Sequence, residues 1–80
     1  PNPAIFFYAA NQLGVNPSDC MVIEDSENGI IAAKAAGMSC VAVPERNAVG
    51  DFSRADLVVE SLEDERLKVF FKNLTQKNMM

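Results

Sequence analysis

The 80-residue sequence predicts an α/β fold in which parallel strands alternate with helices. Short, continuously apolar runs at 20–23 and 40–43 are typical of parallel strands that are covered on both faces. An alanine-rich helical segment joins them, and a strand–helix–strand connection of this length forms a right-handed unit with parallel strands. A buried strand needs a neighbour on each edge, so two or three strands make an incomplete sheet.

The chain is predicted to begin with a helix and a turn. Pro3 suits the first turn of a helix, where its missing N–H is not needed. Gly14 provides a left-handed stop, and residues 16–19 predict a turn before the strand at 20–23. The apolar stripe that indicates this helix consists of Ile5, Phe6, Ala9, Ala10 and Leu13.

The second half of the chain alternates in the same way. A helix is predicted to begin near Ser26 or Glu27 and to end at Gly37, followed by a strand at 40–43 that Pro44 ends. The polar segment 45–55 predicts a surface loop, and 57–59 a short third strand. Residues 61–64 have capping-box spacing, so we expect an amphipathic helix from about 62 to 74 and a frayed tail at 75–80.

Composition and charge exclude several classes of function. The net charge is −4 and the seven basic residues are scattered, which argues against nucleic acid as a partner. No apolar run approaches the ~18 residues of a membrane span, and no signal-peptide pattern opens the chain, so we expect a cytoplasmic protein with no membrane partner. Without histidine, a Ser-His or Cys-His nucleophile cannot exist within the chain. Cys20 and Cys40 fit no zinc pattern and are predicted to be small buried hydrophobes.

Glu24 and Asp25, the acidic pair, follow the first predicted strand at its carboxyl end, where ligands bind in open α/β sheets. Desolvating adjacent carboxylates is costly, so we expect a cation to compensate, and oxygen ligands with retained waters suit Mg²⁺. Because consecutive strand residues face opposite sides, we expect only one of the two carboxylates to bind the ion directly. Asp25, which comes later and has the shorter side chain, is the expected direct ligand, and Glu24 is expected to act through water or through a direct ligand.

Two other readings of this junction stay open at the level of the dipeptide. The N–H groups of the helix that begins near Glu27 lie close by and could orient the carboxylates or a ligand anion. Asp is also a favoured N-cap, so the pair could be a helix cap beside a solvated charge.

The surrounding residues resemble a known family. The stretch "PNPAIFFYAANQLGVNPSDCMVIEDSENGIIAAKAAGMSCVAVP" is similar to the carboxyl-terminal part of the haloacid dehalogenase superfamily of phosphatases, in the branch of β-phosphoglucomutase and sugar-phosphate phosphatases. There a Lys-Pro-x-Pro motif opens a helix, a strand ends in Glu-Asp-Ser, and an alanine-rich helix ends in Ala-Gly-Met. The match is close over residues 1 to about 44 and loose beyond. The matching residues are Pro1, Pro3, Glu24, Asp25, Ser26, Gly29, Ile30, Ala36, Gly37 and Met38.

The resemblance implies a partial, doubly wound, Rossmann-like parallel sheet, with residues 1–80 forming the carboxyl-terminal portion of a core domain. It implies that Asp25 and Glu24 help to hold a catalytic Mg²⁺. It also implies that the intact parent is a phosphatase or phosphomutase of small sugar phosphates. In such enzymes an aspartate on another strand attacks phosphorus, and water or a sugar hydroxyl resolves the aspartyl-phosphate.

The resemblance also marks what this sequence lacks. The Asp-x-Asp-x-Thr nucleophile motif, the phosphate-contacting Ser or Thr and the substrate-selecting cap are absent, and the motif lysine would stand immediately before Pro1. Lys34, mid-helix, is expected to be a solvated residue and no replacement. We therefore expect the chain alone to be inactive, with the missing amino-terminal part of the same protein as its partner. The alternative is a standalone noncatalytic module that binds a partner through an exposed sheet edge.

Overall fold

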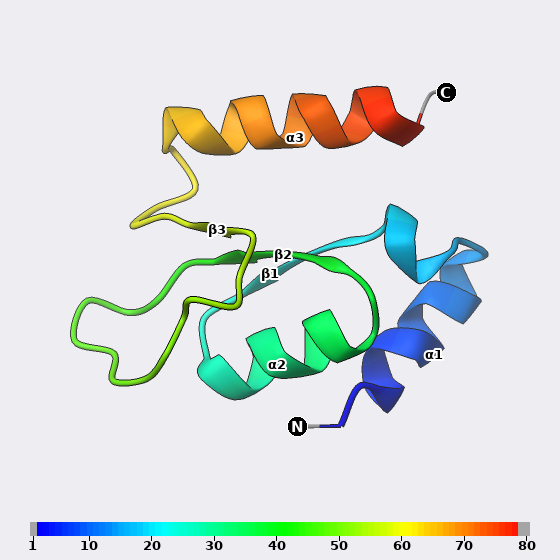
Figure 1. The fold of residues 1–80 in the computed structure, drawn as a ribbon, viewed down its shortest axis with the longest axis horizontal. Coiled ribbons are helices and arrows are strands. Elements are labelled where there is room, and N and C mark those ends of the chain that lie inside the picture. The colour runs from blue at the N-terminus through cyan, green and yellow to red at the C-terminus, as the bar shows by residue number, and fades with distance from the viewer. Residues whose placement is uncertain (1, 79–80) are drawn as a thin grey trace.

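The computed structural model describes residues 2–78 and has the predicted α/β architecture (Figure 1). Helices lie on both sides of one small sheet: α1 and α2 lie on one side of the strands, and α3 lies on the other. The elements are α1 (Ala4–Leu13), a 3-10 turn η1 (Pro17–Asp19), β1 (Met21–Glu24), α2 (Glu27–Ala35), β2 (Ser39–Ala42), β3 (Leu57–Val58) and α3 (Glu65–Asn78).

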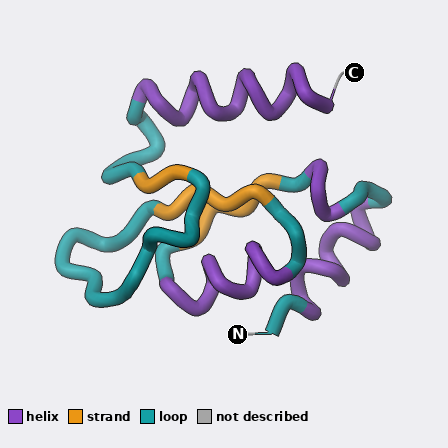
Figure 2. The backbone as a smooth tube through the Cα atoms, viewed as in Figure 1, coloured by secondary structure: helices purple, strands orange, loops and turns teal. Residues whose placement is uncertain are grey.

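The sheet has three parallel strands in the order β1-β2-β3, which run side by side in Figure 2. In its register Val22 lies opposite Cys40 and Glu24 opposite Ala42. The predicted parallel strand–helix–strand unit is therefore confirmed, with α2 as the crossover. β1 begins one residue later than predicted, because Cys20 still donates its N–H to Pro17 in the 3-10 turn (3.0 Å), whereas β2 begins one residue earlier, at Ser39, and β3 begins at the predicted residue.

The core lies between α2 and the sheet. Ile30 and Ala33 of α2 pack against Cys40 and Ala42 of β2, and all four side chains are fully buried. Ala32 and Ala33 of α2 are buried, and such small side chains allow a helix to lie close to a sheet. A second buried cluster of Ala10, Ala36 and Met38 joins α1 to the end of α2. The two clusters share contacts with Phe6 and Val22, so they form one continuous apolar layer.

β1 departs from the prediction of a strand covered on both faces. Val22 packs into the core, but Ile23 on the opposite face is 48% exposed, and Met21 is only partly buried. The outer edge of β1 pairs with no strand among the described residues. The apolar run correctly indicated a parallel strand, but the second cover that it implied is not supplied by residues 2–78.

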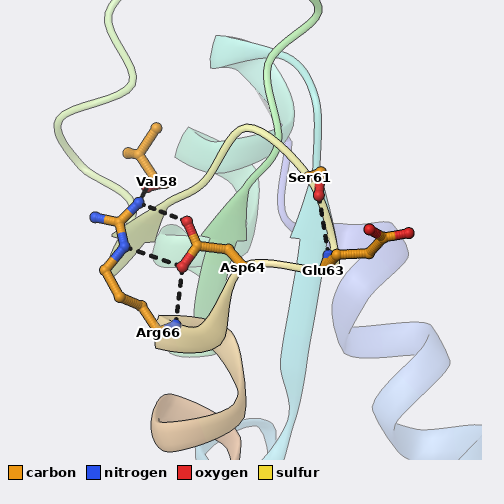
Figure 3. Close-up of polar contacts among 5 residues, drawn as sticks. All are labelled: Val58, Ser61, Glu63, Asp64 and Arg66. Carbon is orange, nitrogen blue, oxygen red and sulfur yellow. Dashed lines mark hydrogen bonds and ion pairs between the residues drawn. The ribbon is translucent and has the colours of Figure 1, made fainter.

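The predicted bounds of the last helix were wrong at both ends. α3 begins at Glu65, and Asp64 rather than Ser61 caps it: Asp64 Oδ1 accepts the N–H of Arg66 (2.8 Å), while Ser61 Oγ accepts the N–H of Glu63 in the preceding turn (3.0 Å; Figure 3). The helix continues through Asn78, since no glycine or proline interrupts residues 75–78. Fraying of residues 75–80 stays a prediction, and residues 79 and 80 lie outside the described residues. None of the described helices is long and apolar enough to cross a membrane.

Asp56 ties the loop before β3 to both α2 and β2. Its carboxylate accepts the Cys40 N–H (2.7 Å) and pairs with Lys34 Nζ (2.9 Å), while its own N–H donates to the Cys40 carbonyl (2.8 Å). Lys34 is thus not the solvated residue that the sequence predicted: its side chain is 35% exposed and ion-paired. Burial acts to raise the pKa of Asp56, but the hydrogen bonds from Lys34 and Cys40 outweigh it and lower that pKa below its usual value.

We predict that Asp56→Ala lowers the free energy of unfolding at pH 7 by about 1–2 kcal/mol, because the Cys40 N–H is left without its acceptor. The exposed ion pair with Lys34 contributes less. Since the folded pKa of Asp56 is lowered, its stabilisation is present above the unfolded pKa of about 3.9 and is lost as the pH falls below it. Urea unfolding between pH 7 and pH 3 should therefore show a flatter acid dependence in the variant. Asp19→Ala, at an exposed aspartate, is the matched control, and equal losses in the two variants would contradict the role of Asp56.

Candidate functional site

The acidic pair lies where β1 gives way to α2. Glu24 is the last residue of β1, Asp25 follows in the turn, and α2 begins at Glu27. The pair is therefore at the carboxyl end of a parallel strand, at the edge of the sheet where the sequence predicted it. Ser26, in extended conformation, accepts the Gly29 N–H on its Oγ (3.0 Å) and caps α2. The alternative in which Asp25 is the helix cap is thus wrong, because Ser26 occupies that position.

The two carboxylates have different surroundings. The Glu24 side chain is half-buried, and its Oε1 accepts the Asp25 N–H (3.3 Å) and the Ser26 hydroxyl (3.4 Å). Asp25 is exposed, and within the described residues its carboxylate makes no hydrogen bond or ion pair. The chain therefore holds Glu24 in place and leaves Asp25 available to a ligand from outside.

The donor set of the pair fits Mg²⁺ as part of a site. Both side chains offer hard carboxylate oxygens, and Mg²⁺ is commonly held by one or two carboxylates while it keeps several waters. No cluster of three or more His, Cys, Asp and Glu side chains suited to a metal forms within residues 2–78. The assignment of Asp25 as direct ligand and Glu24 as indirect ligand stays a prediction.

A cleft of about 900 Å³ opens beyond the carboxyl ends of β2 and β3, but neither Glu24 nor Asp25 lines it. It contains charges of both signs, from Glu45, Arg46, Glu60 and Arg66. Arg66 is already engaged: its guanidinium donates to the Val58 carbonyl (3.1 Å) and to Asp64 Oδ2 (2.9 Å; Figure 3). The hydrogen bond from Arg66 holds the pKa of Asp64 below its usual value. We read these contacts as holding the end of β3 to the start of α3.

The cysteines take no part in the site. Cys40 is fully buried in the core, where burial raises the pKa of its thiol to about 11, so it stays a neutral hydrophobe at physiological pH. Cys20 is half-buried, and both cysteines are free. The prediction of a small buried hydrophobe is confirmed for Cys40 and holds only in part for Cys20.

Sequence reasoning missed Asp56 and Arg66, and it gave no physical role to Gly29. The partners of Asp56 lie 16 and 22 residues away along the chain, and Arg66 contacts the Val58 carbonyl eight residues away as well as its near neighbour Asp64. The contacts between distant residues have no local spacing that could predict them. Gly29 was visible as a motif position, but the reason for a glycine there depends on where the Glu24 side chain lies.

The amino-terminal half of the chain matches a family model. Residues 1–37, which include the acidic pair and the whole of α2, match the haloacid dehalogenase-like hydrolase family. A putative phosphatase, YhcW of Bacillus subtilis, is 42% identical over 79 residues, which are 98% of this chain and 36% of that protein. The β-phosphoglucomutase of Bacillus subtilis is 42% identical over 76 residues, which are 95% of this chain and 32% of that protein.

A solved structure has the same fold. A haloacid dehalogenase family hydrolase from Deinococcus radiodurans R1, crystallised with bound phosphate and sodium, superimposes with a TM-score of 0.74 at 31% identity. The superposition covers 92% of this chain and 35% of that one. The chain thus spans about a third of the length of the relatives that it matches. The chain corresponds to the carboxyl-terminal portion of haloacid dehalogenase-like hydrolases.

Proposed function

We propose that the chain contributes the acidic metal-binding motif to a Mg²⁺-dependent phosphatase or phosphomutase of small sugar phosphates, which works through an aspartyl-phosphate. One observation carries the proposal: the exposed Asp25 carboxylate has no partner in the described chain, and it lies at the carboxyl end of β1 within the matched residues 1–37. Relatives named as a putative phosphatase and a β-phosphoglucomutase support this reaction class.

In this proposal the two carboxylates divide the work. Asp25 binds Mg²⁺ directly, and Glu24, held by the Ser26 hydroxyl and the Asp25 N–H, orients a water of the ion. The bound ion would neutralise negative charge on the phosphoryl oxygens of the substrate. The nucleophilic aspartate comes from a strand outside this chain, because no Asp-x-Asp-x-Thr motif occurs in it.

The surface of β1 supports the proposal that another segment of the same protein completes the sheet. The outer edge of the strand is unpaired among the described residues. An apolar groove of about 430 Å³ separates the exposed face of β1 from α3. This β1 groove is lined by Met21, Ile23, Leu62, Leu67, Lys68 and Phe71. We propose that the remaining part of the same protein adds a strand beside β1, which would place its nucleophile at the same edge of the sheet as Asp25.

The same free edge also favours the second candidate, a noncatalytic module that captures a strand of another protein. The two candidates differ in what the isolated chain should do. A standalone module should be a stable monomer or a symmetric dimer, whereas an incomplete domain should expose the β1 groove and aggregate.

We expect Asp25→Asn in the intact protein that carries this chain to reduce Mg²⁺-dependent hydrolysis of sugar phosphates by about a hundredfold or more, because a charged metal ligand is lost. Steady-state phosphate release at varied Mg²⁺ concentration measures the effect. Asp19→Asn, an exposed aspartate before β1, is the matched control and should keep the parent rate. Unchanged activity in Asp25→Asn would refute the assignment of Asp25.

The purified 80-residue chain should not turn over p-nitrophenyl phosphate in the presence of Mg²⁺, because it lacks the nucleophile. Size-exclusion chromatography with light scattering, run on the same sample, reports its association state. Metal-dependent turnover would contradict the proposal. An inactive chain that forms a well-folded monomer or symmetric dimer would favour the noncatalytic module.

A further inference from the structure

Gly29 lies in the first turn of α2, where its backbone gives no reason for a glycine. The glycines with positive φ in the described chain are Gly14, Gly37 and Gly50, with φ of 71°, 80° and 152°, and the first two each follow a helix end. Gly29 has no positive φ and lies within α2, where glycine disfavours the helix relative to alanine. The cause must therefore lie in its surroundings.

Those surroundings are the side chain of Glu24. A Cβ built on Gly29 would overlap Cγ, Cδ and Oε1 of Glu24, whereas nothing lies within 4 Å of the same position on Gly14 or Gly37. The Glu24 side chain therefore crosses the first turn of α2 in the space that the missing side chain leaves open.

Hydrogen bonds to one carboxylate oxygen, Oε1, hold the Glu24 side chain in this place. Gly29 donates its N–H to Ser26 Oγ (3.0 Å), and the Ser26 hydroxyl donates to Glu24 Oε1 (3.4 Å). The Asp25 N–H donates to the same oxygen (3.3 Å). Within the described residues Glu24 Oε2 has no such partner, and the positive end of α2 favours a carboxylate at this place.

We propose that Gly29 is a positioning residue of the acidic site: its missing side chain leaves the space in which the Glu24 carboxylate lies over the start of α2, beside Asp25. The inference rests on the proposed function, in which the acidic pair takes up a divalent cation. The role of Gly29 is then to leave the room that the Glu24 carboxylate needs to lie beside Asp25.

Replacing Gly29 by alanine separates this role from a structural one. The added methyl group meets a flexible side chain rather than backbone, so Glu24 swings aside and the chain still folds. Alanine favours the helix, so the melting temperature should stay the same or rise. Affinity for a divalent cation should instead fall about tenfold or more, as when a group that orients a metal ligand is removed.

The test is nuclear magnetic resonance on the intact protein that carries this chain, labelled with ¹⁵N and ¹³C. A nuclear Overhauser contact between the Glu24 γ-protons and the Gly29 α-protons is expected without metal, and its absence would overturn the inference. Titration with Mn²⁺ alone should broaden the amide signals from Glu24 to Gly29 in the wild type, and Gly29→Ala should need at least about tenfold more Mn²⁺ for the same broadening. Asn28→Ala, at the exposed neighbouring position of the same turn, should match the wild type.

The remaining outcomes each decide one point. Equal Mn²⁺ affinity in Gly29→Ala and the wild type would overturn the positioning role while leaving the metal site intact. A wild type that shows the Overhauser contact but no broadening near the pair would overturn the proposed metal site instead, and with it the inference. Because Gly29 acts through Glu24, adding Gly29→Ala to Glu24→Gln should cause no further loss, and a further tenfold loss would contradict the inference.

Discussion

The close packing of α2 against β2 is the constraint on which the rest of this structure depends. Ile30, Ala33, Cys40 and Ala42 are fully buried against one another, and the small side chains bring the helix backbone near the sheet. Because α2 lies close to the sheet, only a short connection joins the end of β1 at Glu24 to the start of α2 at Glu27. That turn contains Glu24 and Asp25, so the core contact sets the place of the acidic pair.

Polar contacts hold β3 and the start of α3, which lie outside this small core. Asp56 joins the loop before β3 to Lys34 on α2 and to the Cys40 backbone on β2. Arg66 joins the end of β3 to Asp64 at the start of α3. These contacts matter because β3 is only two residues long and pairs with β2 at two positions. The backbone acceptors and donors are satisfied there by charged side chains instead of by a longer ladder.

One face of the sheet is covered by helices, and the other face is only partly covered. The face of the sheet under α2 is covered, whereas the opposite face of β1 leaves Ile23 about half exposed beside an apolar groove. In the acidic pair, Glu24 is held by hydrogen bonds within the chain and the Asp25 carboxylate is not. The unpaired edge belongs to β1, and the acidic pair lies at the carboxyl end of the same strand, which is consistent with a chain that spans about a third of its relatives.

The sequence by itself determined the order of the elements, the parallel sheet and the place of the acidic pair after β1. These follow from local signals: apolar runs, a left-handed glycine after each of the first two helices, and the charge change at Glu24. Only the tertiary structure decided that Lys34 is paired, that Ser26 and not Asp25 caps α2, that Ile23 lacks a cover, and that Glu24 lies over Gly29. The physical reason is that a pairing partner, an exposed fraction and a side-chain direction depend on which surfaces meet in space, and no local pattern of residues records that.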